Sequence, residues 1–286
     1  MEVRLFPNFT RPGVGMKPRR EASRPLLPQH ARHCPVLEAG NALGYMVYPP
    51  LEPHESFHIE YLGDGKFRFI FYAKNKQGKM DALFSVGLQM PVAAAGMNRE
   101  EVTFLTKPAV TDRENALLIM RTFIVPEDMG TPTGAIALRG AWNFQTPEGW
   151  DTVYAPIFNM IERPVAPSLV TRVETDWYAH DTEFRYIMEP GEGLTGNSSL
   201  PIGQVFFIPR EEVIMREATK DEIEAIKKSR IEFGEHKRTV RLTTPYGLSY
   251  SPHYLRESRA RKDAASGATP QAPDEDTARD TPTETT

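Results

Sequence analysis

The fold is decided by residues 57–72, which read FHIEYLGDGKFRFIFY. From Phe57 to Tyr61 apolar and polar residues alternate with a period of two, the pattern of a half-buried strand. Turn residues follow at 63–65, Gly-Asp-Gly, and a second apolar run occupies residues 67–72. The stretch therefore predicts a β-hairpin.

Further short apolar runs lie between Gly, Pro, Asn and Asp residues, and each is expected to form a strand. They cover residues 83–90, 102–105, 116–124, 135–138, 170–178, 184–188 and 205–208. In 170–178 the alternation predicts Val173, Thr175 and Trp177 on one, buried face and Arg172, Glu174, Asp176 and Tyr178 on the other.

One segment, residues 219–233, has the pattern of a helix. Thr219 and Glu222 have capping-box spacing, and Ile223 and Ile226 place apolar groups one turn apart. Gly234 is expected to end the helix. Many short strands with one late helix predict a mostly β fold: a single β-sandwich or jelly-roll/cupin-like domain with one C-terminal helix.

Composition divides the chain into four parts. Residues 1–35 are rich in Pro and Arg and predict an extended arm, and residues 36–245 are expected to form the domain, helix included. Residues 246–262 form a basic segment with tyrosines. Residues 263–286 carry a net charge of −5 without any large apolar residue, which predicts a disordered acidic tail.

The whole chain is 40% apolar and 25% charged, as globular proteins are. It lacks an apolar run of about 20 residues, which argues against a membrane span. It starts without the apolar region of a signal peptide, so a cytoplasmic location is expected. Because Cys34 is the only cysteine, an intrachain disulfide and a cysteine-based zinc site are excluded.

Three residues of the 174–181 segment are catalytic candidates: Glu174, Asp176 and His180. Two carboxylates on one strand face can differ in pKa and divide acid and base roles, and a histidine on a loop can move protons. The alternative is structural, with Asp176 paired across a hairpin to Arg185 and His180 simply a turn residue.

His58 and Glu60, at positions i and i+2 of a strand, point to the same face. With His180 they predict a site for iron(II) or another divalent metal, of the two-histidine, one-carboxylate kind used by oxygenases. The alternative is that they form the solvated face of a half-buried strand.

Three other patterns are weaker. Residues 191–196 match the dinucleotide fingerprint but precede a turn-rich sequence instead of a helix, so a loop is expected. His30, His33 and Cys34 have metal-like spacing without a second ligand pair. Basic residues and tyrosines alternate between 237 and 262, a composition that can bind single-stranded nucleic acid, although the near-neutral remainder of the chain makes nucleic acid an unlikely partner.

Four motifs together resemble a bacterial family that is labelled only as a domain of unknown function. They are TPEGWD at 146–151, PIFN at 156–159, VETDW at 173–177 and PR at 209–210. The resemblance implies a single mostly β domain and carries no assigned activity. It directs attention to Trp150, Asn159, Trp177 and the neighbouring Tyr178 as candidate substrate-binding residues, besides Glu174 and Asp176.

These observations leave the function open among three classes. The leading hypothesis is an enzyme that modifies a small molecule or a peptide at the mouth of a β-sandwich. The second is a non-catalytic binding or assembly module that oligomerises through its N-terminal arm. The third is a protein associated with single-stranded nucleic acid.

Overall fold

The computed structural model describes residues 1–21, 27, 34–75, 77–91, 100–106, 112–125, 132–160, 169–243, 247 and 249–266. The chain forms two compact units, Met1–Val213 and Ile214–Thr286. The expected domain of residues 36–245 crosses this boundary, so the late helix belongs to the second unit instead of the β domain.

The predicted hairpin is confirmed as strands β3 (Glu55–Gly63) and β4 (Lys66–Lys74). Gly63, Asp64 and Gly65 all have positive φ at its turn, a backbone conformation that suits glycine. The hairpin is the centre of a five-stranded antiparallel sheet of order β13-β3-β4-β5-β6. The other strands are β5 (Met80–Gln89), β6 (Glu101–Phe104) and β13 (Gly193–Asn197).

The prediction of a strand over residues 116–124 is wrong. The segment forms helix α3 (Arg113–Phe123), which leads directly into the short strand β7 (Ile124–Val125). Asp112 caps the helix by accepting a hydrogen bond from the Asn115 amide at 2.8 Å. An apolar run of this length fits a buried strand and a buried helix equally well, and periodicity alone does not separate them.

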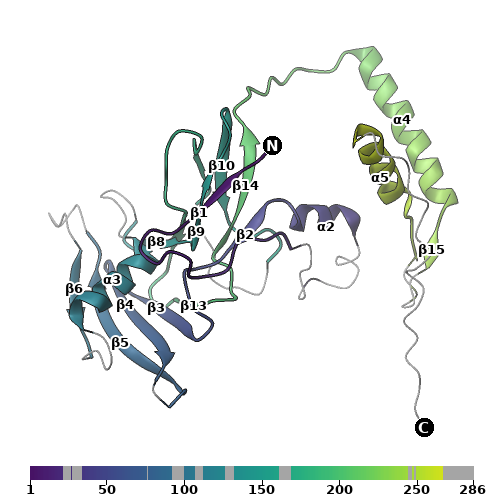
Figure 1. Cartoon of the computed structure of the whole chain (residues 1–286). Helices are drawn as coiled ribbons and strands as arrows, with labels where there is room; N and C mark the ends of the chain where they lie inside the picture. The colour runs from purple at the N-terminus through teal and green to yellow at the C-terminus, as the bar shows by residue number, and fades with distance from the viewer. Residues whose placement is uncertain are drawn as a thin grey trace, which may run out of the picture. The chain divides into compact units, whose positions relative to one another are not determined.

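Phe123 at the end of α3 joins the helix to the main sheet. Its ring lies 5.2 Å from that of Phe57, 6.4 Å from Phe69 and 5.8 Å from Phe71. Figure 1 shows α3 beside β3, β4 and β5. This aromatic cluster is the centre of the hydrophobic core.

Two further antiparallel sheets carry the candidate site. One has the order β12-β8-β7 and the other β11-β10-β14-β2. Their strands are β2 (Tyr45–Val47), β8 (Ala135–Arg139), β10 (Trp150–Ala155), β11 (Thr171–Val173), β12 (Glu183–Ile187) and β14 (Gly203–Pro209). The expectation of a mostly β fold is confirmed, with more helices than the single one expected.

The described part of the N-terminal arm lies on its own unit. Strand β1 (Arg4–Pro7) pairs with β9 (Trp142–Gln145), and Arg19 pairs with Met46. Helix α2 (Pro35–Asn41) follows. Residues 1–21 are therefore a packed part of the β-rich unit and not a free arm.

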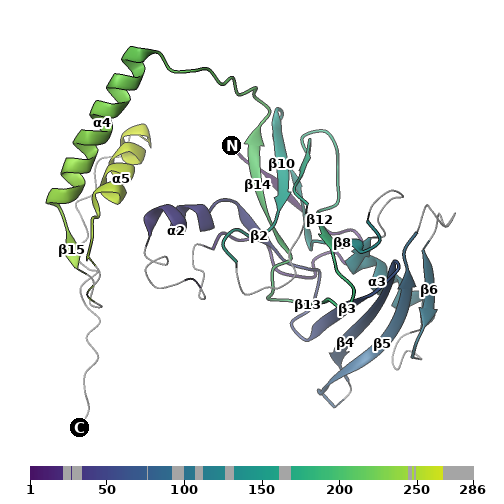
Figure 2. The ribbon, with the colours of Figure 1, turned by 180° about the vertical axis from the view of Figure 1, so that it is seen from behind.

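The second unit contains helices α4 (Lys220–Thr239) and α5 (His253–Ser266) and the two short paired strands β15 (Leu242–Thr243) and β16 (Ser249–Tyr250) (Figure 2). The capping box of Thr219 and Glu222 is confirmed, but the predicted end at Gly234 is wrong, because α4 continues to Thr239. Residues 263–266 of the predicted tail belong to α5, and the rest lie outside the described residues. Among the described helices, none has the length and apolar character needed to cross a membrane.

Candidate functional site

The segment that the sequence singled out, residues 174–181, leaves the edge of a sheet. Strand β11 ends at Val173, and the Thr175 amide turns back to donate to the Val173 carbonyl at 2.9 Å. The expected strand over 170–178 is therefore wrong beyond residue 173. The segment is instead a turn that connects β11 to β12.

Thr175 anchors this turn in the protein interior. Its buried hydroxyl lies 2.9 Å from the Thr146 hydroxyl and 2.6 Å from the Thr152 hydroxyl. Thr146 in turn donates to the Trp150 carbonyl at 2.6 Å. Buried hydroxyls that are satisfied in this way fix the position of the chain that carries them.

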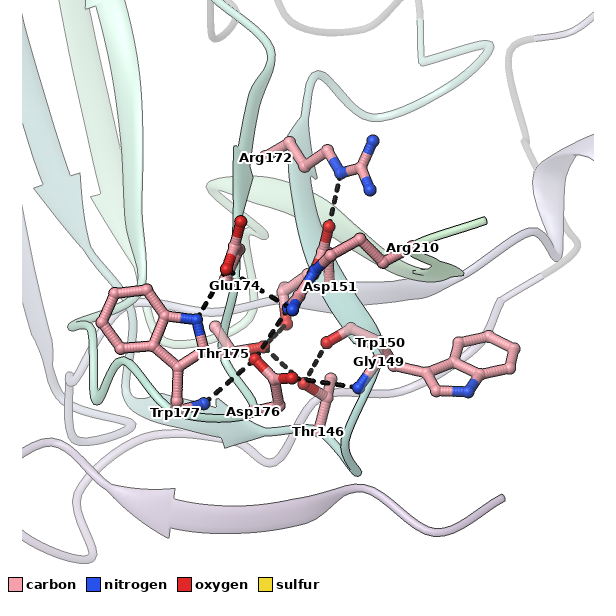
Figure 3. Close-up of polar contacts among 11 residues, drawn as sticks. Thr146, Gly149, Trp150, Asp151, Arg172, Glu174, Thr175, Asp176, Trp177 and Arg210 are labelled. Atoms are coloured by element: carbon pink, nitrogen blue, oxygen red, sulfur yellow. Dashed lines mark hydrogen bonds and ion pairs between the residues drawn. The ribbon is translucent and has the colours of Figure 1, made fainter. Parts of the chain in front are cut away.

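Asp151 on β10 is the buried centre of an ion-pair network (Figure 3). Its Oδ2 lies 2.5 Å from Arg172 Nε, and its Oδ1 accepts from Arg210 Nη2 at 2.6 Å and Nε at 3.0 Å. Burial alone would raise the pKa of Asp151, but the hydrogen bonds from Arg210 and Arg172 outweigh it and lower that pKa. Asp151 is therefore held as a carboxylate.

Arg210 extends the network to the turn. Its Nη2 also lies 2.8 Å from Asp176 Oδ1, and Asp176 Oδ2 accepts from the Gly149 amide at 3.0 Å. Arg210 is the main cause of the lowered pKa of Asp176. The expected pair of Asp176 with Arg185 is wrong: Arg185 lies near Glu183 instead, at 3.9 Å.

Glu174 and Trp177 are at the outer edge of the network. Trp177 Nε1 donates to Glu174 Oε2 at 2.6 Å, and Arg210 Nη1 lies 3.4 Å from the same oxygen. Trp177 nevertheless remains 70% exposed and Tyr178 49% exposed. The expected burial of Trp177 is therefore wrong, because the strand that would have turned it inward ends four residues earlier.

Aromatic rings continue from this edge toward the interior. Ring centroids are 5.8 Å apart between Trp177 and Tyr178, 5.5 Å between Tyr178 and His180, and 6.2 Å between His180 and buried Tyr154. His180 thus lies between an exposed ring and a buried one.

Glu183, at the start of β12, is the buried acid next to His180. Its carboxylate oxygens lie 3.5 Å from Arg139 Nε and 3.9 Å from Arg185 Nη2. Burial raises the pKa of Glu183, although Arg139 and His180 act to lower it. Carboxyl groups whose pKa is shifted by burial and by neighbouring charges are concentrated at functional sites, which makes Glu183 a candidate for proton transfer.

The structure brings together some of the predicted site residues and separates others. Glu174, Asp176, Trp177, Tyr178 and His180 lie on one turn. The Trp150 side chain points away from Arg210 in Figure 3. Asn159 donates to Asn41 on α2 at 2.8 Å, outside this network.

The predicted metal ligands are not brought together. His58 Nδ1 lies 3.0 Å from Thr195 Oγ1, and Glu60 pairs with Arg68 on β4. Among the described residues, no group of three His, Cys, Asp or Glu side chains could hold a metal ion. His58 and Glu60 instead have neighbours of the kind found on the polar face of a strand, which was the alternative interpretation.

Of the weaker patterns, residues 193–197 form strand β13, so the expected loop at 191–196 is only partly correct. Cys34 precedes α2, and His30 and His33 lie outside the described residues.

Sequence reasoning missed Asp151, Arg172, Arg210 and Glu183 as site residues. Asp151 and Arg210 both occur in the motifs that carry the family resemblance, but their pairing spans 59 residues. Spacing in the sequence gives no signal for such a pair.

Comparison with protein-family models and with curated proteins found no match to this chain. The resemblance to a domain of unknown function therefore stays a prediction, and the function rests on the site itself.

Proposed function

We propose that the β-rich unit binds a small molecule or peptide through a guanidinium or ammonium group, on the surface formed by Trp177, Tyr178 and Glu174. The observation that carries the proposal is that the exposed ring of Trp177 is fixed in place by a hydrogen bond to the Glu174 carboxylate. An exposed ring that is already held loses little conformational freedom when a ligand stacks on it.

The charge of the network supports a cationic ligand. The network contains three carboxylates and two guanidinium groups, which leaves one excess negative charge. They belong to Asp151, Glu174, Asp176, Arg172 and Arg210. The Arg210 guanidinium is used mainly by the two aspartates, at 2.6 and 2.8 Å, and its contact with Glu174 is longer. Glu174 is also 48% exposed, so its charge is accessible to a ligand.

Aromatic faces add to this preference. A cation over a Trp or Tyr ring gains roughly 0.5–2 kcal/mol from the ring quadrupole. A guanidinium can stack on Trp177 or Tyr178 and donate hydrogen bonds to Glu174, which combines two interactions that a neutral ligand would not make.

The test is a titration with N-acetylarginine amide, followed through the indole N–H signals of the three tryptophans in ¹H–¹⁵N spectra. We expect the Trp177 signal to shift, and the isosteric but neutral N-acetylcitrulline amide to bind at least about fivefold more weakly, which is a difference of roughly 1 kcal/mol. Glu174→Gln keeps an acceptor for Trp177 but removes the charge, so it should reduce the preference for arginine.

Trp150→Phe is the matched control, because this indole points away from the network. It should leave binding unchanged. Equal binding of the arginine and citrulline amides, or no shift of the Trp177 signal, would contradict the proposal.

A second candidate function, modification of the bound peptide by acid–base chemistry, is favoured by the raised pKa of Glu183 beside His180. Here Glu183 takes the acid–base role that the sequence assigned to Glu174 and Asp176, since these two are engaged by Arg210. Incubation with arginine-containing peptides, followed by mass spectrometry, tests it: Glu183→Gln should bind the peptides yet leave them unmodified. If wild type also leaves every peptide unmodified, this second function is rejected while the binding proposal stands.

A further inference from the structure

Charge is unevenly distributed within the second unit: residues 214–262 are basic, and residues 263–286 carry a net charge of −5. Residues 214–262 contain twelve Lys and Arg against seven Asp and Glu, a net charge of +5, while the chain as a whole has −4. Electrostatic interactions in solution decay over about 10 Å at 0.1 M salt, so a partner responds to the local charge and not to that of the chain. The near-neutral sum over residues 1–262, which argued against nucleic acid, combines the −4 of residues 1–213 with the +5 of residues 214–262.

An open pocket of about 420 Å³ lies in this unit, where Phe233 of α4 meets one face of α5. Its lining combines two aromatic and two basic residues with one acid and one serine: Phe233, Tyr254, Arg261, Lys262, Glu257 and Ser258. Tyr254, Ser258 and Arg261 recur along α5 at the spacing of one helix face, which explains why one helix supplies most of the lining.

The two aromatic residues of the pocket differ in how they are packed. The ring of Phe233 on α4 lies 4.7 Å from that of His253 at the start of α5, and the His253 ring lies 5.7 Å from that of His236, so Phe233 packs against the start of α5. Tyr254 remains 44% exposed. The Phe233 ring is therefore packed, while the Tyr254 ring is open to a ligand.

The basic residues of the pocket are accessible. Arg261 is 83% exposed, and its contact with Glu257 is long, at 4.0 Å. Arg256 and Arg259 lie on the same helix and add two positive charges.

We propose that this pocket binds single-stranded nucleic acid, with one base stacked on Tyr254 and phosphates paired with Arg261 and Lys262. Rings beside basic side chains are the combination that such ligands use, because every base has a face to stack and every nucleotide a phosphate to pair. An acidic peptide would use the charges but gain less from the open ring. The proposal concerns a different unit from the Trp177 surface and is independent of it.

The test is fluorescence anisotropy of a labelled twelve-nucleotide oligo(dT) with the full chain, at several salt concentrations between 50 and 200 mM. Arg261→Gln with Lys262→Gln should weaken binding and make the slope of log K against log salt shallower by about 1.4, from roughly 0.7 per lost phosphate contact. Tyr254→Ala should weaken binding about fivefold or more while leaving the slope unchanged, because stacking releases no counterions.

Lys227→Gln with Lys228→Gln is the matched control. It removes the same charge from α4, at residues that do not line the pocket. We expect a smaller loss than with the pocket variant. Circular dichroism should show that all variants keep their helix content.

Three results would overturn the proposal: no binding of oligo(dT) at 50 mM salt, an equal loss with the pocket and control variants, or no effect of Tyr254→Ala. Poly-glutamate competing as well as unlabelled oligo(dT) would assign the pocket to acidic peptides instead.

Discussion

Trp177 donates its indole N–H to Glu174 at 2.6 Å while its ring stays 70% exposed. The two residues are three positions apart on one turn. Their side chains lie on the surface, outside the core, and hold each other in place. Because the ring is already held, a ligand that stacks on it restricts little further motion.

The stability of the protein should depend little on this ring. Trp177→Ala is expected to change the free energy of unfolding by no more than about 0.5 kcal/mol, because a surface substitution loses little packing. Phe69→Ala, in the centre of the core, should cost roughly 3–5 kcal/mol in the same urea titration. A cost for Trp177→Ala similar to that of Phe69→Ala would show that the ring is buried after all.

Asp151 should be a main determinant of stability. Asp151→Asn removes the charge that binds both Arg172 and Arg210, and is expected to cost roughly 2–4 kcal/mol. Glu60→Gln is the matched control, since it breaks the more exposed pair with Arg68 and should cost at most about 1 kcal/mol. Similar costs in urea unfolding would mean that the Asp151 network is no stronger than a surface pair.

Acid should unfold the wild type partly through the same network. The pKa values of Asp151 and Asp176 are lowered in the folded state, so their stabilisation is present above the unfolded pKa of about 4 and is lost as the pH falls through the lowered values. Unfolding free energies measured from pH 6 to pH 2.5 should therefore fall less steeply for Asp151→Asn than for wild type. Parallel curves would contradict this assignment.

Glu183 should act in the opposite direction. Its pKa is raised in the folded state, so its contribution is fully present below the unfolded pKa and is lost as the pH rises through the folded value. Glu183→Gln should leave stability unchanged near pH 4 and increase it relative to wild type toward pH 8. If wild type and variant instead keep a constant difference between pH 4 and 8, Glu183 does not titrate as the structure indicates.

The start of α4 offers a local test. Thr219→Ala removes the side chain that accepts from the Glu222 amide and should destabilise the first turn by about 1 kcal/mol. Ser229→Ala, in the exposed middle of the helix, should stabilise it slightly. Amide exchange in the first turn measures the difference, and an equal response of the two variants would contradict the role of the cap.

The parts of the fold that depend on residues close together in the sequence could be predicted. The hairpin of β3 and β4 and the cap of α4 depend on neighbouring residues, and both could be predicted. The turn at Thr175 could not, because its direction depends on the hydroxyls of Thr146 and Thr152, which lie 29 and 23 residues away. The same is true of the site: Glu174 and Asp176 were predicted, but Asp151 was not, and Arg210, which engages all three, is distant from them in the sequence.

Arg210 directly follows β14, near the end of the β-rich unit. Its amide donates to the Gly149 carbonyl, in the turn before β10, at 2.7 Å. Exposed residues follow, including Val213, Ile214 and Met215, before α4 begins at Lys220. Mechanical load applied through the second unit would therefore reach the β-rich unit first at Arg210. The ion pairs of Arg210 with Asp151 and Asp176 thus also resist a force transmitted along the chain from residues 211–220.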